Sequence, residues 1–171
     1  METQALVGGL SAAASVAAML AALFSYLAVR HARRSHQSSV YLTMAQRYDS
    51  EEMRGACNTL LGWWREHGED AAAEEWARLR AEGDPRALEV NTARRIVARH
   101  FLNIARLQET GAIDRHLARR LAQVYGLNVF YRIAAPLNRK IANDVKDFEN
   151  LTGRLRQLQP SYARGELIQT F

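Results

Sequence analysis

The first 29 residues form an almost unbroken run of apolar and small side chains, and no side chain from Thr3 to Val29 is charged at neutral pH. As a helix, the stretch from residue 6 to residue 29 is about 36 Å long, enough to cross a bilayer core of about 30 Å. Its large apolar side chains favour insertion by roughly 3 to 5 kcal/mol, and its glycines and serines offset part of this. We therefore predict a modestly hydrophobic transmembrane helix over 6–29.

Beyond this stretch the apolar positions recur at helical spacing, with glycines and prolines between the segments, and no segment alternates as a β-strand would. The predicted fold class is all-α, with an N-terminal transmembrane helix followed by a cytoplasmic four- to five-helix bundle. The expected parts are a short external N-terminus (1–5), the transmembrane helix (6–29), a basic juxtamembrane helix (30–48), the bundle (49–158) and a C-terminal tail (159–171).

Within the bundle, local signals place the helix boundaries. Asp49 or Ser50 is expected to cap a helix that ends near Gly68, and Asp114 is expected to cap another. The predicted helices cover 51–68, 88–110, 115–125 and 136–158, with an acidic segment over 69–82. The first of these buries the stripe Met53, Cys57, Leu60, Leu61 and Trp64, so Cys57 is predicted to be a small buried hydrophobe. The last buries the stripe Leu137, Ile141, Val145, Phe148, Leu151 and Leu155.

Charge is distributed unevenly along the chain and predicts an orientation. The net charge is +5, and all 23 basic residues lie beyond Val29. Arg30, Arg33 and Arg34 directly follow the apolar stretch, and no acidic residue occurs there before Asp49. The positive-inside rule then places the N-terminus outside and the C-terminal part in the cytoplasm of a bacterial inner membrane, with the three arginines against anionic headgroups. A cleaved signal peptide fits poorly, because its positive charge precedes the apolar run.

Small residues repeat at every fourth position of the apolar stretch. Gly9, Ala13, Ala17 and Ala21 form one such row. Rows of this kind let two helices pack closely in a membrane, which indicates self-association or docking on another membrane protein. A general bias toward alanine and arginine explains the same row equally well, since 21 of the 23 basic residues are arginine.

Trp63 is a candidate for contact with the membrane surface. If the juxtamembrane helix is straight, the turn near residue 49 lies on the order of 27 Å below the membrane. The next helix then returns by a similar distance and brings Trp63 near the headgroups, where tryptophan is favoured. A position in the core is the alternative interpretation.

The usual catalytic and metal-binding patterns do not occur in this sequence. Its five histidines include no Glu-x-x-His and no His-Glu-x-x-His, and it contains no Walker loop, dinucleotide-binding loop or Gly-x-Ser-x-Gly. Cys57 is the single cysteine, so these residues alone form no disulfide. We predict no catalytic residue, cofactor or metal. The alternative is an enzyme or effector with a site near His100 and Asn103, although His100 lies on an apolar face and is better explained as a core residue.

The arginine surplus raises the question of an anionic partner. Arg95, Arg99 and Arg106 lie opposite the apolar face of the predicted 88–110 helix, as either a solvated face or a surface for an acidic partner. Nucleic-acid binding is a further alternative. It is disfavoured because acidic residues alternate with the basic ones and because Arg132 occupies the position where a helix-turn-helix needs an apolar residue.

Several motifs carry a family resemblance. They are Thr92-Ala-Arg-Arg-Ile-Val-Ala-Arg-His-Phe-Leu-Asn103, then Gly111-Ala-Ile-Asp114, then an apolar-aromatic segment ending near Pro136. The chain resembles, over residues 5–150, uncharacterised bacterial single-pass membrane proteins with a cytoplasmic helical domain of unknown function. It departs from them at Ile104-Ala-Arg106, where an acidic residue is expected. The resemblance implies an anchored helical domain and transfers no catalytic residue.

Taken together, these features predict a protein that works by binding. We expect a membrane-anchored helical interaction module, as an accessory, scaffold or regulatory subunit of an inner-membrane complex. The expected partners are an anionic lipid bilayer and either a membrane protein or a second copy of the chain.

Overall fold

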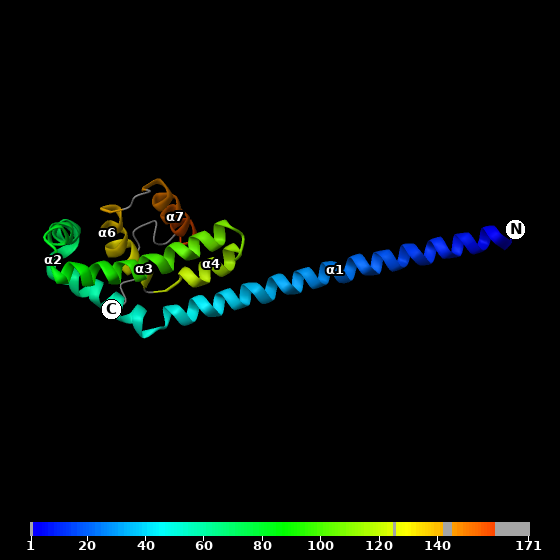
Figure 1. The fold of residues 1–171 in the computed structure, drawn as a ribbon, viewed down its shortest axis with the longest axis horizontal. Helices are drawn as coiled ribbons and strands as arrows, with labels where there is room; N and C mark the ends of the chain where they lie inside the picture. Colours follow the sequence, from blue (N-terminus) through cyan, green and yellow to red (C-terminus); the bar gives the residue numbers. More distant parts are fainter. Residues whose placement is uncertain (1, 125, 142–144, 160–171) are drawn as a thin grey trace. The chain divides into compact units, whose positions relative to one another are not determined.

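The computed structural model describes residues 2–124, 126–141 and 145–159, with side chains from residue 18 onward. Every regular element in this part of the chain is a helix, which confirms the all-α prediction (Figure 1). The chain divides into two compact units, residues 1–40 and 41–171. Helix α1 (Glu2–Tyr48) runs through the first unit as far as residue 40, and its last turns, from residue 41, belong to the second.

The second unit is a bundle of helices of very different lengths. Its elements after α1 are α2 (Glu51–Ala81), α3 (Pro85–Glu109), α4 (Arg115–Ala122), α5 (Gly126–Val129), the π-helix η1 (Phe130–Ala134), α6 (Ala135–Arg139) and α7 (Val145–Leu158).

Two of the predicted helix starts are confirmed and have a local cause, whereas α3 begins at Pro85 rather than at residue 88. The Ser50 hydroxyl accepts a hydrogen bond from the Met53 N–H at 3.2 Å and caps α2. The Asp114 carboxylate accepts one from the Leu117 N–H at 2.8 Å and caps α4. Such side chains satisfy backbone N–H groups that have no partner within the helix, so a short sequence signal suffices to place the boundary.

Gly68 breaks α2 at the predicted position, and helical structure resumes directly after it. Its φ of 77° and ψ of 170° lie in a region that a side chain disfavours. The change of direction lets the Trp63 Nε1–H donate to the Ala72 carbonyl at 3.0 Å, while the Trp63 ring stacks on His67 at 3.8 Å. The acidic segment over 69–82 is therefore the second half of α2.

The expected continuous helix over 136–158 is wrong. Helix α6 ends at Arg139 and α7 begins at Val145; residues 142–144 lie outside the described residues. Upstream, the Ala135 N–H donates to the carbonyl of Phe130, five residues earlier, as in a π-helix. The wider turn directly precedes Pro136, which has no N–H to donate to the preceding turn. Because the helix is interrupted, Val145 is half exposed rather than buried.

Helix α3 is the centre of the bundle. It contacts α2, α4, α5, η1, α6 and α7. The Phe101 ring lies 5.6 Å from the Phe130 ring, and the Trp76 indole N–H donates to the Ala87 carbonyl at 3.1 Å. The buried residues of α3 are Ala87, Val90, Ala93, Arg94, Val97, Ala98, His100, Phe101, Ile104 and Ala105.

Candidate functional site

Many exposed charges of the bundle form ion pairs with neighbouring charges of opposite sign. Such surface ion pairs contribute little stability individually, about 0–1 kcal/mol each, yet they show which charges already have partners. The pairs between different parts of the chain are Arg86–Glu66, Arg106–Asp147, Arg132–Glu69, Arg139–Glu149, Lys140–Glu74 and Arg154–Glu109.

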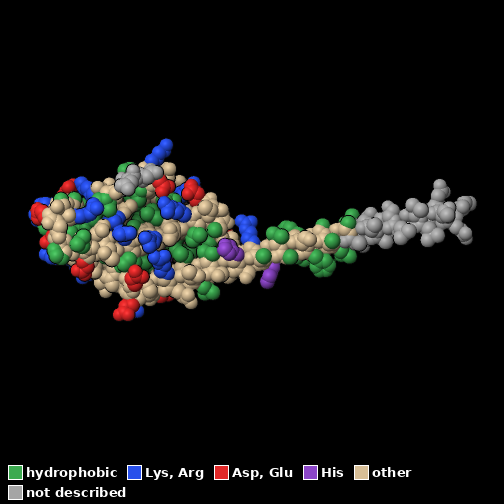
Figure 2. Space-filling view, viewed as in Figure 1, with side chains coloured by type: hydrophobic (Ala, Val, Ile, Leu, Met, Phe, Trp, Pro, Cys, Tyr) green, Lys and Arg blue, Asp and Glu red, His purple; other side chains and the backbone are tan. Residues whose placement is uncertain are grey.

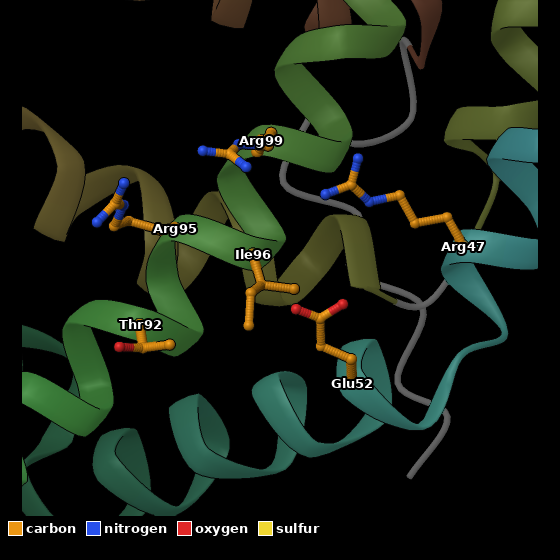
Figure 3. Close-up of a pocket in the computed structure, with 6 residues that line it drawn as sticks. All are labelled: Arg47, Glu52, Thr92, Arg95, Ile96 and Arg99. Atoms are coloured by element: carbon orange, nitrogen blue, oxygen red, sulfur yellow. The ribbon is translucent and has the colours of Figure 1, made fainter.

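Three of the arginines outside these pairs line one cavity. Arg47, Arg95 and Arg99 form no ion pair within the described part of the chain, and they line a cavity of about 180 Å³. Thr92, Ile96 and Glu52 complete its lining. Figure 3 shows the Arg47 side chain extending toward Arg99, with the Glu52 carboxylate pointing into the space between α2 and α3. We call this group the arginine pocket.

The local fold explains how the arginine pocket forms. Arg95 and Arg99 are four residues apart on α3, so they share its exposed face, and Thr92 extends the same face by a turn. Arg47 lies in the last turn of α1, and Glu52 lies in the first turn of α2. The tight corner at Ser50 therefore brings a cation and a carboxylate from two helices against one face of α3.

Two groups near the pocket have lowered pKa values, mainly because they are buried and to a smaller extent because arginines lie near them. Burial and, to a smaller extent, the charge of Arg47 lower the pKa of His100 to about 4. Burial likewise lowers the pKa of Arg94 to about 10, with smaller contributions from Arg95 and Arg80. Glu52 is the one acidic side chain in the pocket lining. The arrangement therefore suits an anionic group.

The predicted arginine face is divided between two places. Arg95 and Arg99 line the arginine pocket, whereas Arg106 donates to the Asp147 carboxylate at 3.0 Å. Arg106 also lines a separate cavity of about 220 Å³ with Met44, Asn103, Leu107 and Thr110. Arg47 was not part of the predicted face. The Asp49–Ser50 cap is the sequence feature that could have predicted the position of Arg47, because a sharp corner at the cap turns the end of α1 toward α3.

The predicted contact of Trp63 with the membrane surface is wrong. Its side chain is 3% exposed, and its indole N–H is bonded to the Ala72 carbonyl. Trp64 is the half-buried neighbour, with Arg132 over its ring at 5.2 Å. The buried stripe of α2 thus contains Ala56 and Trp63 in place of the expected Leu61 and Trp64.

His100 and Cys57 are both core residues. His100 is 1% exposed, lies 5.0 Å from the Phe101 ring and 5.5 Å from the Tyr48 ring, and has no hydrogen-bond partner in the described residues. It lines neither of the two cavities. Burial raises the pKa of the Cys57 thiol to about 11. Within the described residues, no group of three or more His, Cys, Asp or Glu side chains could hold a metal ion.

Comparisons with known proteins add no relative to this picture: no family model, curated protein or solved structure matches the chain.

The remaining predicted site residues lie on α1. Arg30, Arg33, Arg34 and Ala21 are exposed, whereas the side chains of Gly9, Ala13 and Ala17 lie outside the described residues. From residue 19 to residue 29 the helix exposes a row of large apolar side chains, before the basic residues begin (Figure 2). They are Met19, Leu20, Leu23, Phe24, Tyr26, Leu27 and Val29. Across the residues whose side chains are described, no helix has the length and apolar character needed to cross a membrane.

Proposed function

We propose that this chain is a membrane-anchored helical interaction module, acting as an accessory, scaffold or regulatory subunit of a bacterial inner-membrane complex. Its first unit is the anchor, with the N-terminus outside, and its helical bundle lies in the cytoplasm. The partner is a membrane protein or a second copy of the chain, and the bilayer carries anionic headgroups.

One observation carries this proposal. Seven large apolar side chains between residues 19 and 29 are 46–73% exposed on α1. Apolar surface of this extent is unfavourable in water and favourable in lipid. The uncharged sequence continues from residue 19 back to Thr3, and Arg30, Arg33 and Arg34 follow at the other end, as the positive-inside rule requires at a cytoplasmic boundary. A lipid bilayer accommodates both the exposed apolar side chains and the basic residues that follow them.

The anchoring is tested by placing two charges in the apolar stretch of the full-length chain. Leu20→Arg with Leu23→Arg costs roughly 5 to 7 kcal/mol on the insertion scale, which exceeds the roughly 3 to 5 kcal/mol that favours insertion. We expect this variant to leave the membrane fraction after carbonate extraction. The matched control is Leu42→Arg with Leu88→Arg, which adds the same charges at exposed leucines outside the stretch and should remain in the membrane. Equal behaviour of the two variants contradicts the anchor.

The partner is tested by affinity purification of the full-length chain in mild detergent, followed by identification of co-purifying proteins and measurement of its oligomeric state. We expect a stoichiometric membrane protein or a dimer. Leucine substitutions at Ala13 and Ala17 should weaken that association if the small-residue row forms the contact. A monomeric preparation without a partner contradicts the interaction module.

A further inference from the structure

The arginine pocket is a space of about 180 Å³ whose lining includes three arginines and one glutamate. With Arg47, Arg95 and Arg99 charged and Glu52 ionised, its lining carries a net charge of about +2. Like charges held close together repel, and no carboxylate of the described residues pairs with these three arginines. A bound dianion removes the repulsion and completes the charge balance.

We propose that the arginine pocket binds a phosphate-class dianion, the terminal phosphate of a small phosphate monoester or of a lipid headgroup. Guanidinium groups bind phosphate oxygens through two parallel N–H bonds, and they are the preferred side chains for this geometry. Arg47 extends from the end of α1 toward Arg99 on α3 (Figure 3), so these two guanidiniums can bind different oxygens of one phosphate group, and Arg95 adds positive charge to the lining. The proposal goes beyond the proposed function, because the pocket lies entirely within the second unit and needs neither a partner protein nor the anchor.

The positions of the lining residues support this chemistry. Arg95 and Arg99 are exposed and can adjust to a ligand, while Arg47 is half buried at the end of α1 and fixes one side of the pocket (Figure 3). Ile96 supplies an apolar surface between them, which suits the carbon portion of a phosphate ester. The Thr92 hydroxyl donates to the Leu88 carbonyl at 3.1 Å, so its proton is already engaged and the arginines remain the donors.

Phosphate binding is measured on the full-length chain in a neutral detergent, by phosphorus NMR titration with inorganic phosphate and with glycerol phosphate. A parallel measurement uses vesicles of phosphatidylcholine with or without phosphatidic acid. We expect Arg95→Gln with Arg99→Gln to weaken binding by about tenfold or more, given the usual strength of a charge-assisted hydrogen bond. We expect Glu52→Gln to tighten it, because the variant removes the one anionic group from the lining.

The matched control is Arg65→Gln with Arg120→Gln, which removes two exposed arginines outside the pocket and changes the net charge equally. Arginine-dependent binding of the soluble phosphates identifies a free phosphate ester as the source. Arginine-dependent binding of phosphatidic acid alone identifies a lipid headgroup. The proposal is overturned if neither probe binds, if the pocket variant binds like the parent, or if the control variant loses as much affinity as the pocket variant. Circular dichroism of each variant checks that the bundle is intact.

Discussion

A methyl group at Gly126 would be crowded by the aromatic rings of Tyr48 and Phe101. A Cβ at this position would lie 3.0 Å from Cε2 of Tyr48, 3.2 Å from its hydroxyl and 3.4 Å from Cζ of Phe101. The Gly126 N–H also donates to the Tyr48 hydroxyl at 2.9 Å. To accept the methyl, the Tyr48 ring, which connects the end of α1 to the start of α5, must shift by a few tenths of an ångström.

We expect Gly126→Ala to destabilise the second unit. Overpacking of a filled site costs about 1–3 kcal/mol. The substitution also recovers about 0.5–1 kcal/mol, because alanine loses less backbone entropy than glycine in a helix. The net loss is up to about 2.5 kcal/mol in the free energy of unfolding, and a chain of this size loses roughly 2–4 °C of Tm for each kcal/mol. Thermal unfolding followed by circular dichroism in neutral detergent measures the change.

Two glycines in the exposed face of α2 provide the matched control. No atom lies within 4 Å of the Cβ position at Gly55 or Gly62, so alanine at either one should stabilise the protein by about 0.5–1 kcal/mol. A second control removes the Tyr48 ring: in a Tyr48→Ala background, Gly126→Ala should lose most of its cost. The reasoning is refuted if Gly126→Ala raises the Tm as Gly55→Ala does, or if its cost is unchanged without the ring.

Three further predictions concern single side chains. Because the pKa of His100 falls from 6.5 to about 4 on folding, the unfolded chain binds more protons between these values. Stability should decline as pH falls through that range, by up to about 1.4 kcal/mol per pH unit, and His100→Leu should abolish this part of the decline in parallel urea titrations. Asp114→Ala removes the cap on the Leu117 N–H and should cost about 1 kcal/mol in thermal unfolding, whereas Asp114→Asn should retain most of the stability. Cys57 is buried with a pKa of about 11, so iodoacetamide at pH 8 should modify it only after denaturation; rapid labelling of the native protein contradicts its burial.

The parts of the fold that depend on local chemistry could be predicted from the sequence. Ser50 and Asp114 cap helices through backbone groups three residues away, so the signal and its effect lie within one turn. The break at Gly68 is equally local, because its φ of 77° disfavours residues with a side chain.

Features that depend on distant contacts could not be predicted in this way. Trp63 and Trp64 are adjacent at the edge of one stripe, and the choice between them depends on how the chain folds back toward Ala72 after Gly68. The interruption before Val145 is equally hidden, because the apolar spacing continues across it without a glycine or proline.

The candidate site was predictable in part for the same reason. Arg95 and Arg99 are one helical turn apart, so the sequence places them on one face of α3. Arg47 and Glu52 reach this face only through the corner between α1 and α2. Arg106 continues the sequence pattern, but it forms an ion pair with Asp147, 41 positions further along the chain. Helical periodicity does not predict a contact over that distance.

The central position of α3 has a consequence for how the bundle opens. Because α2, α4, α5, η1, α6 and α7 all contact α3, it cannot detach from one neighbour without disturbing the others. Its middle turns should therefore exchange their amide protons only when the whole unit unfolds, whereas the ends of α2 and α7 open in smaller, independent steps. The exchange rate along α3 thus reports global stability, and any ligand held by its exposed face slows exchange throughout the helix.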